Sequence, residues 1–391
     1  VGLDSNDALL RSYLGKAYFE EKRAPLDADQ FNIAKQLSPN DPTPYLYAGI
    51  AKQTENRPVE ASRDLEKSIE LNDNRAAFRG RLLLDKDRAA RGASLARVYK
   101  DLGFNQTGIV ESTMSLAVDP ANASAHRFLS DSHRDGSRRT EISRVSELLQ
   151  AQLLQDLNIN PVQPSISNTN LNIVTAGGPA SAGFNEFTPL FEQNRTQFNA
   201  SAVGGNWDTR GGEAVVSAVY DRFSGSVGGF LFESNGFRDN SNTEHEIYNA
   251  FGQVALSPTV NLQAELGRRH TDYGDIAMHF DPDDFSPTLR TSLDDDTGRV
   301  GLRFSPNKHS TLLLSAIYAD REGEQYQVQT VDFGGGFFVD FELDGQLDED
   351  VYQYDAAYIY QRDTFNVTVG GAYADSDRED TFILGEVGFP P

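Results

Sequence analysis

The second half of the chain alternates between apolar and polar residues, and this two-residue period constrains the fold more than any other feature. In residues 261–267, Leu262, Ala264 and Leu266 alternate with polar residues and glycine. Successive side chains of a β-strand point to opposite faces of its sheet, so the period predicts about ten strands of roughly eight to twelve residues. The candidates are 196–204, 213–222, 226–233, 245–256, 261–267, 299–304, 310–319, 352–360, 365–373 and 381–388.

Charge and aromatic content also divide the 391 residues, whose formal net charge is −23. Residues 1–160 carry 22 basic and 23 acidic side chains, whereas residues 161–391 carry 13 and 35 and hold 30 of the 40 aromatic residues. Segments that differ this much are expected to form separate cores. We therefore predict a helical repeat domain at 1–157, a linker at 158–194 and a β-domain at 195–391.

Composition excludes several functions. The negative charge argues against nucleic acid as a partner, because a phosphate backbone requires a basic surface. The absence of Cys excludes disulfides, thiolate metal sites and Cys nucleophiles. The sequence has no phosphate-binding loop and no recognisable catalytic triad, so we predict no enzyme. No apolar run approaches the roughly 18 residues of a membrane helix, so any membrane crossing must use strands.

The first half repeats with a period of about 34 residues, which is the spacing of tetratricopeptide repeats. A third, degenerate unit is expected to end at Asp119-Pro120, and a fourth to run from 123 to about 157. Tyr18 breaks the pattern, because Lys52 occupies the matching position. The matching pairs are Leu14 with Ala48, Gly15 with Gly49, Phe31 with Leu65, Ala34 with Ser68, Leu37 with Leu71 and Pro39 with Asp73.

Stacked helical repeats leave a groove that can hold another protein. We therefore predict that the first domain docks partner proteins, with the alternative that it is only a spacer between other domains. The residues predicted to line the groove are Tyr18, Tyr45, Lys52 and Tyr99.

Alternation alone does not separate a membrane barrel from a soluble β-domain, which remains the alternative. The polar face is strongly polar, and the apolar face often ends in an aromatic residue, as at Tyr220, Phe232 and Tyr373. Short turns at 257–258, 305–308 and 362–363 also alternate with long polar segments at 234–244, 270–297 and 322–349. These features favour an antiparallel transmembrane β-barrel.

About ten strands close only a narrow barrel, whereas loops of this length are typical of a barrel with more strands. The chain also stops at Gly388-Phe389-Pro390-Pro391, not at a strand that ends in an aromatic residue, and begins at Val1 without a signal peptide. We therefore expect a mature form or a fragment, with further strands or several copies of the chain completing the barrel.

Several segments resemble a family of predicted outer-membrane proteins of Gram-negative bacteria, in which tetratricopeptide repeats precede a barrel related to TonB-dependent receptors. The segments are 52–58 (KQTENRP), 68–75 (SIELNDNR), 183–191 (GFNEFTPLF), 220–224 (YDRFS), 232–240 (FESNGFRDN) and 280–290 (FDPDDFSPTLR). The resemblance implies an outer-membrane location with a periplasmic repeat domain. The chain lacks a recognisable plug domain and TonB box, and its domain order also resembles that of exopolysaccharide-export porins.

Two groups of residues are candidates for binding. The first is an acidic loop that could hold Ca²⁺, an ion that takes six to eight oxygen ligands, with a simple solvated loop as the alternative. It comprises Asp281, Asp283, Asp284, Asp294, Asp295 and Asp296. The second is a set of residues predicted to face the barrel lumen: Gln263, Glu265, Arg299, Arg303, Gln353 and Asp355. They either line a polar conduit that favours cations and neutral solutes or pair with one another and fill the lumen.

We predict passage or export across the outer membrane by passive conduction, with the repeat domain recruiting periplasmic or envelope proteins. The alternative is a structural anchor or scaffold for an envelope or extracellular assembly. A third interpretation, a soluble α-plus-β binding protein, predicts extraction without detergent. A homo-oligomer is compatible with each of these functions.

Overall fold

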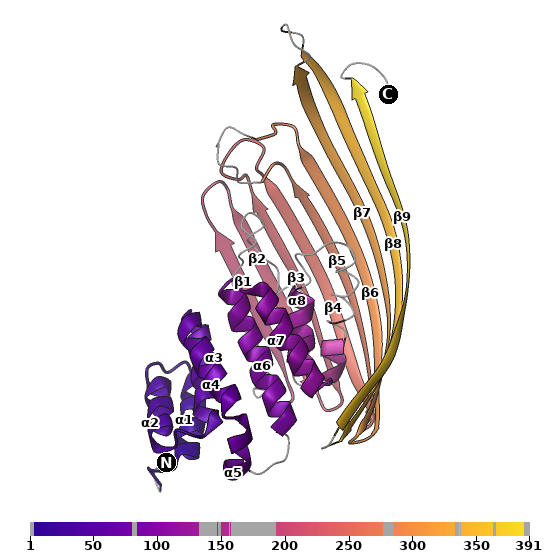
Figure 1. Ribbon diagram of the computed structural model, residues 1–391. Helices are drawn as coiled ribbons and strands as arrows, with labels where there is room; N and C mark the ends of the chain where they lie inside the picture. Colours follow the sequence, from indigo (N-terminus) through magenta and orange to yellow (C-terminus); the bar gives the residue numbers. More distant parts are fainter. Residues whose placement is uncertain are drawn as a thin grey trace. The chain divides into compact units, whose positions relative to one another are not determined.

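The protein folds as a series of helices followed by one antiparallel sheet of nine strands (Figure 1). This computed structural model describes residues 4–79, 84–132, 147, 150–155, 157, 193–276, 285–332, 336, 338–362 and 365–386. Contacts divide it into two compact units, one built around the helices and the other around most of the sheet. Nearly all of the predicted linker 158–194 lies outside the described residues. Among the helices described, none is long and apolar enough to cross a membrane.

The helices begin where the sequence supplies caps and prolines. The side chain of Asp7 accepts hydrogen bonds from the backbone N–H groups of Leu9 and Leu10, and Asp41 caps the next hairpin in the same way. Pro42 and Pro58 occupy first turns, where no backbone N–H is needed. The helices are α1 (Ala8–Glu20), α2 (Leu26–Leu37), α3 (Pro42–Thr54), α4 (Pro58–Glu70), η1 (Asn72–Asn74), α5 (Arg75–Arg79), α6 (Leu84–Asp101), α7 (Asn105–Val118) and α8 (Ala123–Ser132).

One close contact recurs between paired helices. A Cβ atom added to Gly15 of α1 would lie 2.6 Å from the ring of Phe31 in α2, and one added to Gly49 of α3 would lie 2.8 Å from Leu65 in α4. Gly15 and Gly49 are 34 residues apart, as are Phe31 and Leu65. Both hairpins therefore approach closely at the same position of the sequence period.

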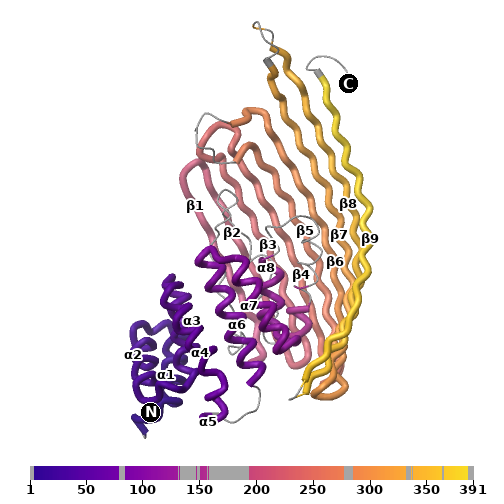
Figure 2. The backbone as a smooth tube through the Cα atoms, viewed as in Figure 1, coloured from indigo at the N-terminus to yellow at the C-terminus, as the bar shows by residue number. Residues whose placement is uncertain are grey.

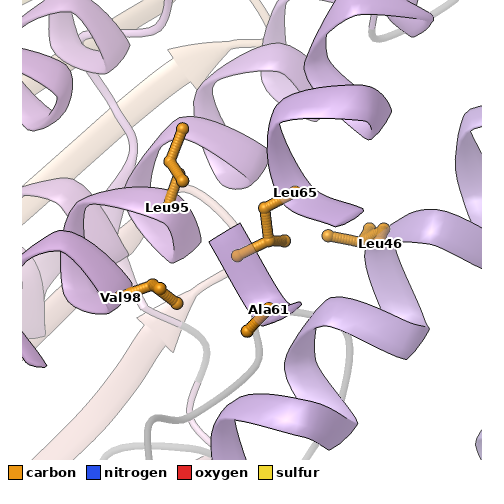
Figure 3. Close-up of a cluster of buried hydrophobic side chains, with 5 residues drawn as sticks. All are labelled: Leu46, Ala61, Leu65, Leu95 and Val98. Carbon is orange, nitrogen blue, oxygen red and sulfur yellow. The ribbon is translucent and has the colours of Figure 1, made fainter. Parts of the chain in front are cut away.

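The hairpins share a continuous apolar core (Figure 3). Leu46 of α3, Ala61 and Leu65 of α4, and Leu95 and Val98 of α6 are all buried in one cluster. The cluster links successive hairpins, because its members come from three helices separated widely in the sequence. A single hairpin cannot bury its own apolar face, so the stack is stabilised when neighbouring hairpins bury these faces against each other.

Replacing Gly15 with Leu tests the importance of the close helix contact. The new side chain would overlap the ring of Phe31, so we expect G15L to lose about 1–3 kcal/mol of unfolding free energy. Ala17→Leu is the matched control, since Ala17 is exposed on the same helix. The measurement is denaturant unfolding of the full chain, followed by circular dichroism at 222 nm. Equal stability of the two variants would contradict the proposed contact.

The nine strands form a meander in which each pairs with its neighbour in the sequence (Figure 2). Among the described residues, the first and the last strand are the two edges of the sheet. The strands are β1 (Arg195–Gly204), β2 (Arg210–Tyr220), β3 (Phe223–Ser234), β4 (Thr243–Ser257), β5 (Val260–Tyr273), β6 (Arg290–Asn307), β7 (Ser310–Asp332), β8 (Phe338–Arg362) and β9 (Phe365–Glu386).

The strands are longer than predicted, and this corrects two expectations. Strands β7, β8 and β9 have 23, 25 and 22 residues, so most of the predicted polar segment 322–349 is strand. The candidate 381–388 is not a tenth strand, because residues up to Glu386 continue β9. The physical reason is that hydrogen bonds between backbones can extend a strand even where neither face is apolar. These segments carry charged residues on both faces, so their composition predicts loops although they are strands.

Candidate functional site

The two faces of the sheet differ in a way that is unusual for a protein surface. The face that carries Gln263, Glu265 and Arg299 is here called the buried face. These polar side chains are 2–7% exposed and lie among buried apolar ones such as Phe251 and Ile317. The opposite face, called the exposed face, carries Leu266 and Val300 with exposed fractions of 67% and 52%. A soluble sheet normally exposes polar residues, so the apolar exposed face and the buried charged side chains both depart from that pattern.

An ion pair between neighbouring strands lies in the middle of the buried face. Glu265 of β5 and Arg299 of β6 lie opposite each other in the ladder, and their side chains are bonded. Asn249 of β4 donates a second hydrogen bond to Glu265, over 2.7 Å. A buried carboxylate is stable only when it is paired and hydrogen-bonded in this way, so the three residues form one unit.

A second charged group lies further along the same face. The carboxylate of Asp295 in β6 accepts hydrogen bonds from Arg269 of β5 and Arg321 of β7. Arg321 also lies 4.0 Å from Glu349 of β8, so the group spans four strands. Sequence alone does not reveal this group, because the composition around Asp295 predicts a loop. The available signal is the two-residue period of β5: Arg269 continues the set of positions that begins with Gln263 and Glu265.

A row of uncharged polar side chains crosses the buried face below the ion pair. Gln253 of β4 donates to Ser224 of β3 over 2.7 Å and lies opposite Gln263 in the ladder. The amide of Gln263 has no hydrogen-bond partner among the residues that the structure describes. On the far side of Gly301, Ser315 of β7 donates to Asp355 over 3.2 Å. This row can hydrogen-bond water or a polar solute.

The structure brings the predicted lumen residues onto one face. Gln263, Glu265, Arg299 and Gln353 are buried there, and Arg303 and Asp355 are half-buried; the amide nitrogen of Gln353 donates to both carboxylate oxygens of Asp355 over 3.0 and 2.9 Å. Within the set, Glu265 pairs with Arg299 across two strands, whereas Gln353 and Asp355 pair within β8. The choice between an open conduit and a filled lumen stays a prediction.

The predicted acidic loop divides into two parts. Asp281, Asp283 and Asp284 lie outside the described residues. Asp294, Asp295 and Asp296 belong to strand β6, which corrects their assignment to a loop. Because side chains alternate along a strand, the three carboxylates do not converge on one point, and each contacts a different side chain of β5: His270, Arg269 and Arg268. Among the described residues, no group of three potential ligands could hold a metal ion.

The exposed face changes from apolar to charged at one level across β5, β6 and β7. The last apolar row consists of residues that are neighbours in the ladder: Leu266, Gly298 and Tyr318. The next row toward the long connections is charged and consists of Arg268, Asp296 and Asp320. On β8, Tyr352, Tyr354 and Tyr358 continue the exposed aromatic surface. The face therefore has an apolar belt with a sharp charged border.

In the helical unit, a cavity of about 230 Å³ lies among α2, α3 and α4. Its floor is apolar, formed by Phe31, Ala48 and Ala51, and its rim carries Lys52 and Glu60. Asp64 positions the rim residue Lys52, which donates to its carboxylate over 2.7 Å, and Lys35 donates to the same carboxylate over 2.7 Å. Burial lowers the pKa of Lys35, and the hydrogen bond to Asp64 opposes this shift.

The four residues predicted to line a partner groove do not all meet. Lys52 lines the cavity, and Tyr45 is linked to its rim because Lys35 lies 4.8 Å from the ring centre of Tyr45. Tyr18 contacts Arg23. Tyr99 donates to Glu66 over 3.1 Å, and burial together with this hydrogen bond raises the pKa of Tyr99 to about 12.

Comparisons with known proteins add little. No protein-family model and no curated protein matches the chain. Among solved structures, the crystal structure of MamA is similar over 38% of this chain and 79% of that chain, with a TM-score of 0.31 and 17% identity. This similarity is too distant to assign a fold or a function.

Replacing Arg299 with Met tests the ion pair on the buried face. The variant leaves Glu265 buried without its charged partner, so we expect R299M to lose about 3–5 kcal/mol of stability. In the double variant E265Q/R299M, the loss should be smaller than the sum of the single losses. The control is Arg268→Gln on the exposed face, which should change the denaturation midpoint little. Additive losses would exclude the pair as a coupled unit.

Proposed function

We propose that the protein is a β-barrel protein of the Gram-negative outer membrane that acts in passage or export, with a periplasmic tetratricopeptide arm that docks partner proteins. The observation that carries the proposal is the polarity of the sheet: its exposed face is apolar, and its opposite face buries charged and amide side chains among apolar ones. A large apolar surface is unfavourable in water, whereas it is required where strands face lipid.

The dimensions of the apolar belt support this location. A transmembrane strand needs about 9–11 residues, and residues 352–360 of β8 provide an aromatic stretch of this length. Tyr248 and Tyr318 lie near the charged border, where interfacial aromatic residues gather in membrane barrels. The charged ends of the long strands would then extend beyond the membrane.

Lipid also requires that the edges of the sheet be paired. Unpaired backbone groups of β1 and β9 would each cost several kcal/mol in a hydrocarbon environment. We infer that in the membrane these edges are hydrogen-bonded, either to further strands or to another copy of the chain.

The helical unit supports a docking role. The contact between Gly15 and Phe31 recurs 34 residues later between Gly49 and Leu65, which is the period of tetratricopeptide repeats. The cavity with Phe31 at its floor and Lys52 at its rim can accept an apolar side chain flanked by polar groups. Periplasmic or envelope proteins are the partners that this arrangement suggests.

Polar groups on the buried face support a conduit. The amide of Gln263 and the half-buried carboxylate of Asp355 offer hydrogen bonds to water and polar solutes, and no catalytic group is needed for passive conduction. The proposed conduit has no resident cofactor, and Ca²⁺ binding near Asp281 remains a prediction from the sequence.

Conductance measurements test passage directly. The full chain should require detergent for extraction, and the purified protein should give ohmic currents in a planar bilayer with a preference for cations. Asp355→Asn removes a carboxylate from the buried face, so it should lower this preference. Asp296→Asn, on the exposed face, is the control and should leave the selectivity unchanged.

A structural anchor is the second candidate function. It is favoured by the pairing of Glu265 with Arg299 and of Asp295 with Arg269 and Arg321, since such pairs fill an interior. A folded, membrane-inserted protein that carries no current would support the anchor over passage. Extraction without detergent would contradict both.

A further inference from the structure

A hollow of about 520 Å³ lies on the exposed face of the sheet, across β3 to β7. Its floor is formed where Ala250 of β4 and Gly298 of β6 leave room on either side of Leu266 of β5, because these three residues are neighbours in the ladder. Neither Ala250 nor Gly298 carries a larger side chain on a face that elsewhere carries Leu, Val and Tyr. The hollow therefore exists because β4 and β6 place small residues at the same level of the ladder, one on each side of β5.

The walls of the hollow are apolar and its upper rim is charged. Val227, Leu266 and the rings of Tyr248 and Tyr318 form the walls. A Cβ atom added to Gly298 would have Leu266 as its nearest neighbour, at 3.6 Å, so there is room above this residue. The hollow thus lies directly below the charged border of the apolar belt.

Two opposite charges lie together at the rim. The guanidinium of Arg268 and the carboxylate of Asp296 are 3.8 Å apart, and their side chains are 64% and 54% exposed. The pair is therefore accessible to a ligand that carries both an anionic and a cationic group. A phosphate suits a guanidinium, and an ammonium group suits the carboxylate of Asp296.

We propose that this hollow holds one acyl chain of a phospholipid with a phosphoethanolamine headgroup, whose phosphate contacts Arg268 and whose ammonium group contacts Asp296. The inference rests on the proposed function, because it requires the exposed face to meet lipid. Charge complementarity selects this occupant: a purely anionic headgroup would contact Arg268 but be repelled by Asp296 and the adjacent Asp320.

Native mass spectrometry of the full chain tests the proposal. The protein is purified in mild detergent after reconstitution in vesicles of equal parts phosphatidylethanolamine and phosphatidylglycerol. We expect the wild type to retain one phosphatidylethanolamine molecule. Gly298→Phe fills the hollow and should lower the retained fraction about tenfold. Gly371→Phe is the matched control, because Gly371 of β9 lies outside the hollow with no atom within 4 Å of an added Cβ.

The headgroup is tested separately, which keeps the proposal falsifiable if G298F does not fold. Asp296→Asn removes the partner of the ammonium group, so it should abolish the preference for phosphatidylethanolamine over phosphatidylglycerol while a lipid is still retained. Equal retention by G298F and G371F, or an unchanged preference in D296N, would overturn this inference alone. Release of the wild type from cells without detergent would instead overturn the proposed function.

Discussion

The structure depends on how the sheet distributes polarity between its faces. Leu262 and Leu266 of β5 project to the exposed face, while Gln263 and Glu265 between them are buried. A one-residue shift in register would exchange these surroundings for the whole strand. The pairing of Glu265 with Arg299 opposes such a shift, because a buried carboxylate is costly when it loses its partner. The buried Glu265–Arg299 pair therefore helps to fix the register in which β5 and β6 pair.

The helical unit uses a different principle. Its hairpins pack closely where Gly15 and Gly49 leave room for Phe31 and Leu65, and the apolar cluster around Leu65 joins one hairpin to the next. This packing leaves a cavity that has an apolar floor and charged residues at its rim. A membrane-anchored protein with such an arm can bring a bound partner to the membrane surface, which connects the two parts of the proposed function.

Local sequence predicted those features that depend on short periods. The alternation around Leu262 located β5, and the 34-residue spacing located the contacts of Gly15 and Gly49. It failed where charged residues occupy both faces of a strand, as around Asp295, because composition there matches a loop although the backbone ladder continues. The hollow around Gly298 was not predictable either, since it needs the register of neighbouring strands.

The most direct measurement of the central claim is a tryptophan scan along β5 in vesicles with brominated acyl chains. The chain has a single Trp, at position 207, so a W207F background allows one Trp at a time at positions 262–267. The account predicts quenching at 262, 264 and 266 and little quenching at 263 and 265, because only the first set faces lipid. Uniform quenching, no quenching or the opposite alternation would contradict it.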